Sequence, residues 1–272
     1  MELREAFHLC LDAFGKGEEI KAYDLLEELI KVTRKDFILQ PDRKLTSKET
    51  RSLYSALEDV KKGRPLPYIL HKAYFMGESF YVDERVLIPR YDTEHSIEVI
   101  RSLVPEAPKI LEIGTGSGCV AITLAKLFPE GYIVSADISK DALDVATINV
   151  KNHEADNLQL LHSDLFDKIE NTFDVIYSNP PYISEKEMAV LDKSVLDFEP
   201  HLALYGGVEG LDFYEAITKE ARHYLNPNGY LVFEIGADQG DAVKNLLEKH
   251  LFKDIQIRRD FSGLDRVLYG RL

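Results

Sequence analysis

Hydrophobic residues in the first 64 positions recur every three or four residues, which is the spacing of amphipathic helices. One such stretch spans residues 3–14, a second spans residues 23–32, and a third begins at Thr46 or Ser47 and ends at Gly63. Helices of this kind bury their apolar stripes against one another. The pattern therefore predicts a small N-terminal helical bundle.

The pattern changes after Pro65-Leu66-Pro67, where we expect the helical region to end. Residues 73–75 and 79–82 are mostly apolar and flank the turn Met76-Gly77-Glu78, which predicts a β-hairpin. The hairpin would connect the bundle to the rest of the chain. The prediction is thus a helical domain, a hairpin linker and a larger domain, at residues 1–71, 72–89 and 90–272.

From Lys109 onward, predicted strands alternate with predicted helices. The candidate strands are residues 109–113, 132–137, 158–162, 173–178, 229–235, 253–258 and 265–270. The clearest helices are residues 118–127, 140–151, 211–225 and 238–250. Such alternation is typical of the α/β class with a doubly wound, mostly parallel sheet. Only residues 259–264 separate the last two strands, which is too short for a parallel crossover, so these two should pair antiparallel.

Composition and cysteine usage indicate the compartment. No apolar run approaches the roughly 20 residues that cross a bilayer, and residues 1–6 resemble a helix rather than a signal peptide. The two cysteines, Cys10 and Cys119, are far apart and lack metal-site spacing, which suits a reducing environment. The eight histidines are scattered as well. We therefore predict a cytoplasmic protein without a metal site or membrane contact.

The distribution of charge bears on the substrate. The formal net charge is −14, and residues 1–72 hold 14 basic against 13 acidic side chains. Residues 73–272 hold 19 basic against 34 acidic side chains. Proteins that bind nucleic acid through its phosphates usually carry a basic patch. We therefore expect no direct nucleic-acid partner.

A glycine loop follows the buried strand 109–113. Its residues, Gly114-Thr115-Gly116-Ser117-Gly118, lie directly before a predicted helix, where glycines let the backbone pass close to a ligand. Asp137, at the end of the next strand, is placed to bind the hydroxyls of a ribose. Together they predict a cofactor that contains adenosine. The loop also fits a loose dinucleotide fingerprint at Gly116-x-Gly118-x-x-Ala121, so NAD or FAD, or a turn that only packs, remain open at this point.

The fourth predicted strand ends in Asn179-Pro180-Pro181-Tyr182. Ligands of open α/β sheets bind beyond the carboxyl ends of the strands, so this turn should face the same crevice as the glycine loop. The prolines restrict the backbone and direct the Asn179 side-chain oxygen and the Pro180 carbonyl to one point. Two such acceptors would orient an amide-type nitrogen for attack on a sulfonium methyl and stabilise the developing charge, while Tyr182 packs on a planar group. The other interpretation is an ordinary loop.

With both motifs placed, the chain resembles the HemK (PrmC) family of protein-glutamine N5-methyltransferases that act on peptide-chain release factors. The resemblance spans nearly the whole chain. It rests on Leu87–Arg90, Thr93-Glu94, Gly114–Gly118, Asp137, Asn179–Tyr182, Glu199-Pro200, Ala203–Gly207, Gly210-Leu211, Phe233–Gly236, Gln239 and Leu264–Leu268. Departures from the family pattern are His71, Tyr91-Asp92, Phe198 and Leu165. The resemblance implies a Rossmann-like class I methyltransferase fold.

The resemblance also implies roles for individual residues. The cofactor would be S-adenosyl-L-methionine (AdoMet), converted to S-adenosyl-L-homocysteine. Residues 114–118 would enclose its methionine part, Asp137 its ribose, and Asp164 and Leu165 its adenine, and Asn179 would contact the cofactor as well as the substrate. Residues 179–182 would hold the glutamine amide of the Gly-Gly-Gln motif in class I release factors, with the N-terminal bundle as the docking surface.

Other functions and roles compete with these. The same chemistry could act on a ribosomal-protein glutamine or an exocyclic amine of DNA or RNA, although no basic recognition domain is evident. A non-catalytic binding module would not need Asn179, and a nicotinamide oxidoreductase would lack a hydride-transfer partner. Arg90 and Glu94 could form a simple ion pair, and Glu234 could be a strand-end residue without a ligand. Residues 205–207 could be a flexible loop or one that closes over the substrate.

Overall fold

The computed structural model describes residues 1–272, which divide into two compact units. The smaller unit contains residues 1–72 and 192–198, and the larger contains residues 73–191 and 199–272. The hairpin thus groups with the larger unit. Residues 192–198 group with the N-terminal helices, whereas the predicted division placed them with the rest of 90–272.

The smaller unit is helical. Its helices are α1 (Leu3–Phe14), α2 (Glu19–Ile30), α3 (Asp36–Leu39), α4 (Ser47–Lys61), α5 (Leu66–Leu70) and α10 (Lys193–Phe198). Thr46 caps α4, because its hydroxyl accepts a hydrogen bond from the Glu49 amide at 3.2 Å and the Glu49 carboxylate accepts one from the Thr46 amide at 2.7 Å. The three predicted helices are confirmed.

The predicted end of the helical region at residues 65–67 is wrong. Helix α5 begins at Leu66, directly after Pro65, and Pro67 lies in its first turn. A proline in the first turn costs the helix no hydrogen bond, because the amide groups there have no partner within the helix. The same prolines that break a helix interior are therefore compatible with the start of a new helix.

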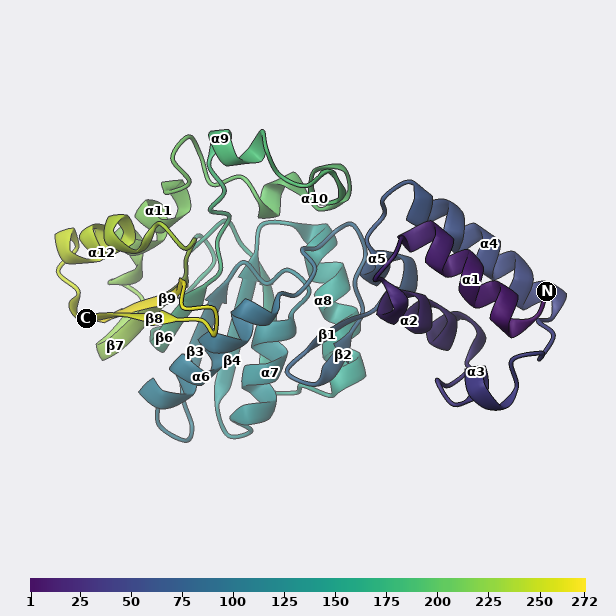
Figure 1. The fold of residues 1–272 in the computed structure, drawn as a ribbon. Coiled ribbons are helices and arrows are strands. Elements are labelled where there is room, and N and C mark those ends of the chain that lie inside the picture. Colours follow the sequence, from purple (N-terminus) through teal and green to yellow (C-terminus); the bar gives the residue numbers. More distant parts are fainter. The chain divides into compact units, whose positions relative to one another are not determined.

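The larger unit is an α/β domain (Figure 1). Its elements are β1 (Ala73–Phe75), β2 (Glu78–Phe80), η1 (Tyr91–Thr93), α6 (Glu94–Leu103), β3 (Lys109–Ile113), α7 (Cys119–Leu127), β4 (Tyr132–Asp137), α8 (Lys140–His153), β5 (Leu158–His162), β6 (Phe173–Ser178), α9 (Glu185–Met188), η2 (His201–Ala203), α11 (Asp212–Ala221), β7 (Leu225–Glu234), α12 (Gly240–Lys249), β8 (Lys253–Arg259) and β9 (Asp265–Arg271). Strands β3 to β6 have the predicted bounds. Helix α6 was not predicted.

A seven-stranded sheet in the order β5-β4-β3-β6-β7-β9-β8 forms the centre of the larger unit. Strand β9 runs antiparallel to both of its neighbours, and the other pairs are parallel, which confirms the predicted mostly parallel sheet with an antiparallel end. Ile113 at the end of β3 pairs with Ala136 of β4 and with Ser178 of β6. Gly114 and Asn179 come next along the chain, so the register brings the glycine loop and the Asn-Pro-Pro-Tyr turn to one edge of the sheet.

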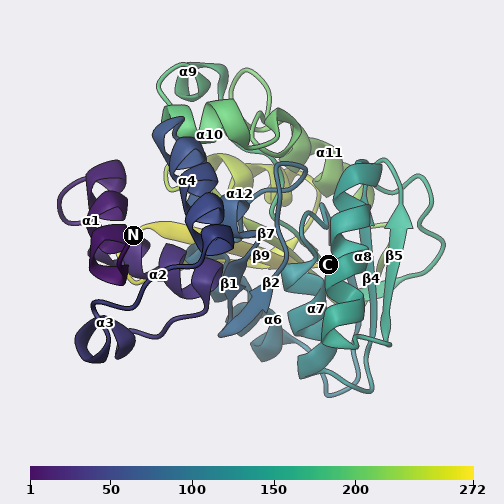
Figure 2. The same cartoon turned by 90° about the vertical axis from the view of Figure 1, so that its right-hand side faces the viewer.

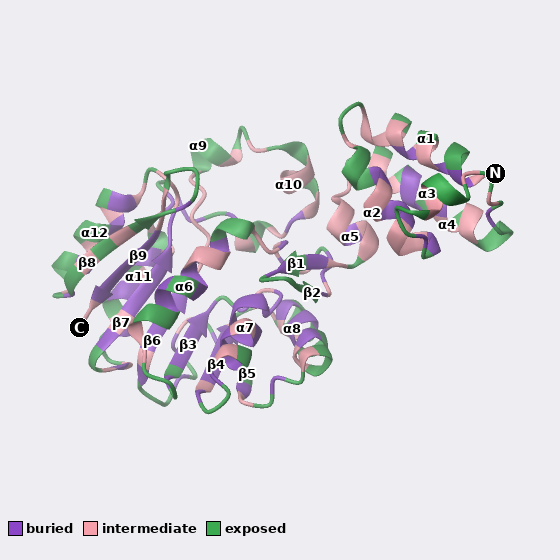
Figure 3. Cartoon of the chain, turned by 60° about the horizontal axis from the view of Figure 1, so that its bottom comes forward, coloured by how far each residue is buried: buried purple, intermediate pink, exposed green.

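Helices cover both faces of this sheet. Helices α6, α7 and α8 share a core with residues of one sheet face, while α11 and α12 share a second core with residues of the other face. Figure 2 shows α7 and α8 beside β4 and β5, and Figure 3 shows the inner strands of the sheet as mostly buried, whereas the edge strand β8 is largely exposed. The apolar strands 109–113 and 173–178 fit this sandwiched position. None of the helices combines the length and apolar character that a bilayer crossing requires.

Candidate active site

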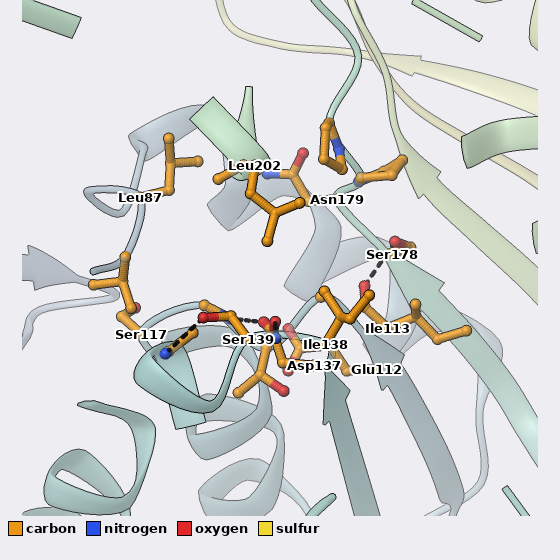
Figure 4. Close-up of a pocket in the computed structure, with 18 of the residues that line it drawn as sticks. Leu87, Glu112, Ile113, Ser117, Asp137, Ile138, Ser139, Ser178, Asn179 and Leu202 are labelled. Atoms are coloured by element: carbon orange, nitrogen blue, oxygen red, sulfur yellow. Dashed lines mark hydrogen bonds between the residues drawn. The ribbon is translucent and has the colours of Figure 1, made fainter. Parts of the chain in front are cut away.

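A cavity opens at the carboxyl ends of β3, β4 and β6. It is lined by Arg85–Arg90, Thr93, Glu112–Ser117, Cys119, Val120, Ala136–Ser139, Ala142, Ser163–Leu165, Ser178–Pro181, Pro200, Leu202, Ala203, Phe213 and Ile217. Among these are all of the residues predicted to bind cofactor or substrate except Gly118 and Tyr182. Figure 4 shows Leu87, Leu202 and Asn179 across the cavity from Asp137 and Ser139.

The glycine loop is held by the strands beside it. The Gly114 amide donates to the Ala136 carbonyl at 2.8 Å, and Gly114 adopts a φ of 90° that favours glycine. A Cβ on Gly118 would lie 3.3 Å from the side chain of Ala146 on α8. Gly118 therefore allows the start of α7 to pack closely against α8, and it does not line the cavity. Cβ on Gly114 would lie 3.8 Å from the Asn179 carbonyl, which places the loop next to the Asn-Pro-Pro-Tyr turn.

Asp137 connects the loop to the next helix. Its Oδ2 accepts a hydrogen bond from the Gly116 amide at 2.9 Å, and its Oδ1 accepts one from the Ser139 amide at 2.8 Å. Burial raises the pKa of Asp137, and the two amides oppose that rise. Each carboxylate oxygen has further acceptor capacity, so the side chain can still bind two hydroxyl groups in the cavity.

Apolar side chains line the part of the cavity beyond Asp137. Leu165, predicted to border adenine, lies here together with Ile138, Leu87 and Leu202. The Ser163 hydroxyl donates to the Leu165 carbonyl at 3.0 Å and stabilises a left-handed backbone, with φ of 44° at Leu165. Ile138, Leu87 and Leu202 were not predicted to be binding residues. The available signals were the position of Ile138, one residue after Asp137, and that of Leu87 in the segment Leu87–Arg90 that carries the family resemblance.

Glu199 joins two segments that line the cavity, residues 85–90 and residues 200–203. Its carboxylate accepts hydrogen bonds from the Arg90 guanidinium at 2.5 Å and from the Ile88 amide at 3.2 Å. Glu199 is only 4% exposed, so its carboxylate is shielded from solvent, whereas the Arg90 side chain is partly exposed. The segments it joins carry Leu87 and Leu202. The alternative that Arg90 and Glu94 form an ion pair is wrong. Arg90 pairs with Glu199, and Glu94 accepts a hydrogen bond from the Met76 amide.

The Asn-Pro-Pro-Tyr turn presents Asn179, Pro180 and Pro181 to the cavity. Tyr182 lies outside the cavity lining and packs against the core shared with α11 and α12, where burial raises its pKa to about 12. The Tyr182 carbonyl accepts a hydrogen bond from the Gln239 side chain at 3.0 Å. The predicted packing of the Tyr182 ring on the substrate therefore stays a prediction.

The loop at residues 204–207 is attached to this turn. The Gly206 amide donates to the Ile183 carbonyl at 3.0 Å, and the Ile183 amide donates to the Leu204 carbonyl at 2.9 Å. A Cβ on Gly206 would lie 2.5 Å from the Pro181 carbonyl oxygen and 2.7 Å from Tyr182 Cα. Only glycine permits the loop to approach the turn this closely.

Replacing Gly206 by alanine should displace the turn. Because an ångström of misplacement costs about 100-fold in rate when reacting groups must align, we expect kcat to fall at least about tenfold. The cofactor affinity should change less than about twofold. Gly131→Ala is the control, since a Cβ there also meets backbone, at 3.0 Å, but on the opposite edge of the sheet. Equal kcat values for the two variants would contradict the prediction.

Glu112 is a buried carboxyl group that lines the cavity. Its side chain accepts a short hydrogen bond from the Ser135 hydroxyl, which also contacts the Thr115 hydroxyl at 2.7 Å. Burial, opposed by the Ser135 hydrogen bond and assisted by the nearby Asp137 carboxylate, raises the pKa of Glu112 to about 8. Glu112 was not predicted as a site residue, because the pattern of strand 109–113 is that of a buried core strand.

The raised pKa makes stability depend on pH. Between the ordinary value of 4.5 and about 8, the folded chain keeps a proton on Glu112 that the unfolded chain has released, so stability falls as pH rises through this window. Glu112→Gln removes the effect while keeping an acceptor for Ser135. The measured quantity is the thermal midpoint of the variant minus that of wild type. We expect this difference to be larger at pH 8.5 than at pH 6 by about 2–4 °C or more. Glu130→Gln, at an exposed position, is the control, and parallel pH profiles for all three proteins would refute the prediction.

Comparisons with known proteins agree with this architecture. A model of the PrmC N-terminal domain matches residues 3–70, and a model of the methyltransferase small domain matches residues 95–260. A solved methyltransferase from Pyrococcus furiosus shares the fold with a TM-score of 0.55 at 18% identity, covering 83% of this chain and 98% of that one. A Thermus thermophilus 16S rRNA N2 G1207 methyltransferase, solved with AdoMet and guanosine, has a TM-score of 0.52 at 18% identity, covering 74% of this chain and 49% of that one. The predicted class I methyltransferase fold is confirmed.

Sequence relatives are more specific. A release factor glutamine methyltransferase of Chlorobaculum tepidum is 39% identical over 257 residues, which cover 90% of this chain and 87% of that protein. A release factor glutamine methyltransferase of Koribacter versatilis is 35% identical over 279 residues, which cover 100% of this chain and 99% of that protein. Identity at this level over nearly the whole length shows that the chain belongs to the PrmC (HemK) family of release factor glutamine methyltransferases.

Proposed function

We propose that the chain methylates the side-chain amide nitrogen (N5) of the glutamine in the Gly-Gly-Gln motif of class I peptide-chain release factors. AdoMet supplies the methyl group as an electrophilic sulfonium substituent and leaves as S-adenosyl-L-homocysteine. The observation that carries the proposal is that Asn179 and Pro180 line the same cavity as Asp137 and Gly114–Ser117. A cofactor site and an amide-binding turn thus share one space.

The residues of the cavity suit AdoMet. Asp137 has acceptor capacity for the ribose hydroxyls, since its two hydrogen-bonded amides leave further lone pairs. The apolar surface near Leu165 suits adenine, and Asp164 offers an acceptor for the exocyclic amine. The glycine loop leaves backbone amides and little side-chain bulk for the methionine part. The Asp137 carboxylate, which lines the cavity, also favours a cationic ligand over a neutral one.

The turn suits a primary amide. An amide nitrogen is a weak nucleophile because its lone pair is delocalised into the carbonyl group. The Asn179 side-chain oxygen and the Pro180 carbonyl oxygen would each accept one of the two N–H groups, which orients the nitrogen and stabilises the positive charge that develops on it. Ser178, just before the turn, donates to the Ile113 carbonyl at 2.7 Å and anchors the turn to the sheet.

Membership of the family supports the proposed substrate and location. Relatives named release factor glutamine methyltransferase match this chain in both of its parts, including the N-terminal helices at residues 3–70. We therefore assign the N-terminal unit to release factor docking. Both cysteines are buried free thiols, which is compatible with the reducing cytoplasm, where we place the reaction.

The test is transfer of labelled methyl groups from AdoMet to a purified class I release factor. Parallel reactions contain the intact factor, the factor with the Gly-Gly-Gln glutamine changed to alanine, ribosomal proteins, and DNA or RNA. We expect label on the intact factor alone. Label on the glutamine-to-alanine factor, or on ribosomal protein or nucleic acid with none on the release factor, would overturn the proposed substrate while leaving the cofactor site intact.

A further inference from the structure

Glu234 is a buried carboxyl group beside the Asn-Pro-Pro-Tyr turn. Phe233 of β7 pairs with Ser178 of β6, so Glu234 and Asn179 follow at the same level of adjacent parallel strands. Glu234 is 2% exposed, and its Oε2 atom is fully buried without a hydrogen-bond partner. An unpaired buried carboxylate oxygen costs folding free energy. A role other than stability would account for a carboxylate at this position.

Thr93 lines the cavity and contacts the turn. The Asn179 Nδ2 atom is 3.5 Å from the Thr93 hydroxyl oxygen, at the limit of hydrogen bonding. Thr93 and Asn179 each lower the pKa of the Glu234 carboxyl group, so both side chains lie close to it. A threonine hydroxyl has one proton to donate and lone pairs to accept. If that proton goes to Glu234, the Thr93 oxygen faces Asn179 as an acceptor.

The direction of these hydrogen bonds decides how Asn179 is oriented. The oxygen and nitrogen ends of an asparagine amide have nearly the same shape, so only the neighbouring donors and acceptors distinguish them. We propose that Glu234 is a positioning residue whose ionised carboxylate accepts hydrogen bonds from Thr93 and Asn179, and so directs the Asn179 side-chain oxygen toward the substrate nitrogen. This inference rests on the proposed role of Asn179. A protonated Glu234 would instead donate to Thr93 and favour the reverse orientation.

The titration of Glu234 can be distinguished from that of the charged and titratable groups around it. They are Asp92 of η1, Cys119 of α7, Tyr177 of β6, Tyr182 of the turn, Tyr214 of α11 and Arg266 of β9. Burial raises the pKa of Glu234 to about 7, while the Thr93 hydroxyl and the Arg266 charge lower it. The Arg266 guanidinium is itself paired with Asp260 at 3.1 Å and with Asp92 at 3.3 Å. Burial raises the pKa values of the three tyrosines and of Cys119 away from neutrality.

The test compares kcat from pH 6 to pH 8.5 in wild type, Glu234→Gln and Glu112→Gln at saturating AdoMet. Wild type should lose activity as pH falls through about 7. Glu234→Gln should lower kcat by about 10- to 100-fold at pH 8 and remove this acid limb, with the cofactor affinity within about twofold. Glu112→Gln should keep the limb, which separates Glu234 from the cavity carboxyl whose pKa is about 8. A wild-type kcat or an unchanged limb in Glu234→Gln would overturn the inference.

Substitutions of Thr93 and a stability measurement separate positioning from folding. Thr93→Val should lower kcat like Glu234→Gln because it removes the hydroxyl, whereas Thr93→Ser should retain activity. The thermal midpoint of Glu234→Gln at pH 8.5 should equal or exceed that of wild type, so lost folding would not account for the lost rate. If Asn179→Ala is inactive but Glu234→Gln is normal, only this inference fails. If Asn179→Ala is also normal, the proposed role of the turn fails with it.

Discussion

Replacing Asn179 by alanine is expected to lower kcat by about 100- to 1000-fold, which corresponds to about 2.7–4 kcal/mol of transition-state stabilisation. The side chain lines the cavity at the carboxyl end of β6, next to the glycine loop. Its amide oxygen would accept one N–H of the substrate and stabilise the charge that forms on that nitrogen. Because this charge exists only during transfer, the loss should fall on kcat rather than on substrate affinity.

The measurement is single-turnover methyl transfer together with calorimetric binding of AdoMet. Asn179→Ala should bind the cofactor nearly as wild type does, since Asp137 and the glycine loop remain. Asn152→Ala, at an exposed position on α8, is the matched control and should behave as wild type. A normal rate in Asn179→Ala would remove the central role of the turn, and a parallel loss of cofactor binding would reassign Asn179 to the cofactor site.

Replacing Asp137 by alanine is expected to weaken AdoMet binding by about 2–4 kcal/mol, or about 30- to 1000-fold in Kd. Two effects add here. The ribose would lose hydrogen bonds to a charged acceptor, and the amides of Gly116 and Ser139, now bonded to Asp137 at 2.9 and 2.8 Å, would lose their partner. The glycine loop would then no longer be held in its binding conformation.

Titration calorimetry with AdoMet and with S-adenosyl-L-homocysteine measures this loss. Both ligands should weaken equally, because they share the ribose. Asp137→Asn should bind with intermediate affinity, since the amide keeps one acceptor oxygen. Asp141→Asn, exposed in the first turn of α8, is the control. An unchanged Kd in Asp137→Ala would place the ribose elsewhere in the cavity.

The central sheet was predictable because its strands are buried on both faces. Strands such as 109–113 and 173–178 are mostly apolar and end in a glycine loop or a proline turn, and the structure has them with the predicted bounds. The antiparallel end of the sheet followed from the short connection at residues 259–264. Helix α5 was missed because proline is ambiguous, as it ends one helix and starts another.

The site was predictable only where the chain order itself brings residues together. The glycine loop, Asp137 and Asn179 all follow parallel strands, so the topology places them at one edge. Glu199 connects the segments that carry Leu87 and Leu202, for example through the Ile88–Glu199 hydrogen bond. These contacts join residues more than 100 positions apart, and no periodicity in the sequence indicates them. Glu112 and Glu234 were missed as titrating groups, because their pKa shifts come from burial that only the folded structure reveals.

The most direct measurement is tandem mass spectrometry of a class I release factor after incubation with AdoMet and either wild-type chain or Asn179→Ala. With wild type, we predict one added methyl group on the side chain of the Gly-Gly-Gln glutamine and on no other residue. With Asn179→Ala, that peptide should remain unmodified over the same time. A methyl group on a different residue, or an unmodified factor despite normal AdoMet binding by the wild-type chain, would contradict the account.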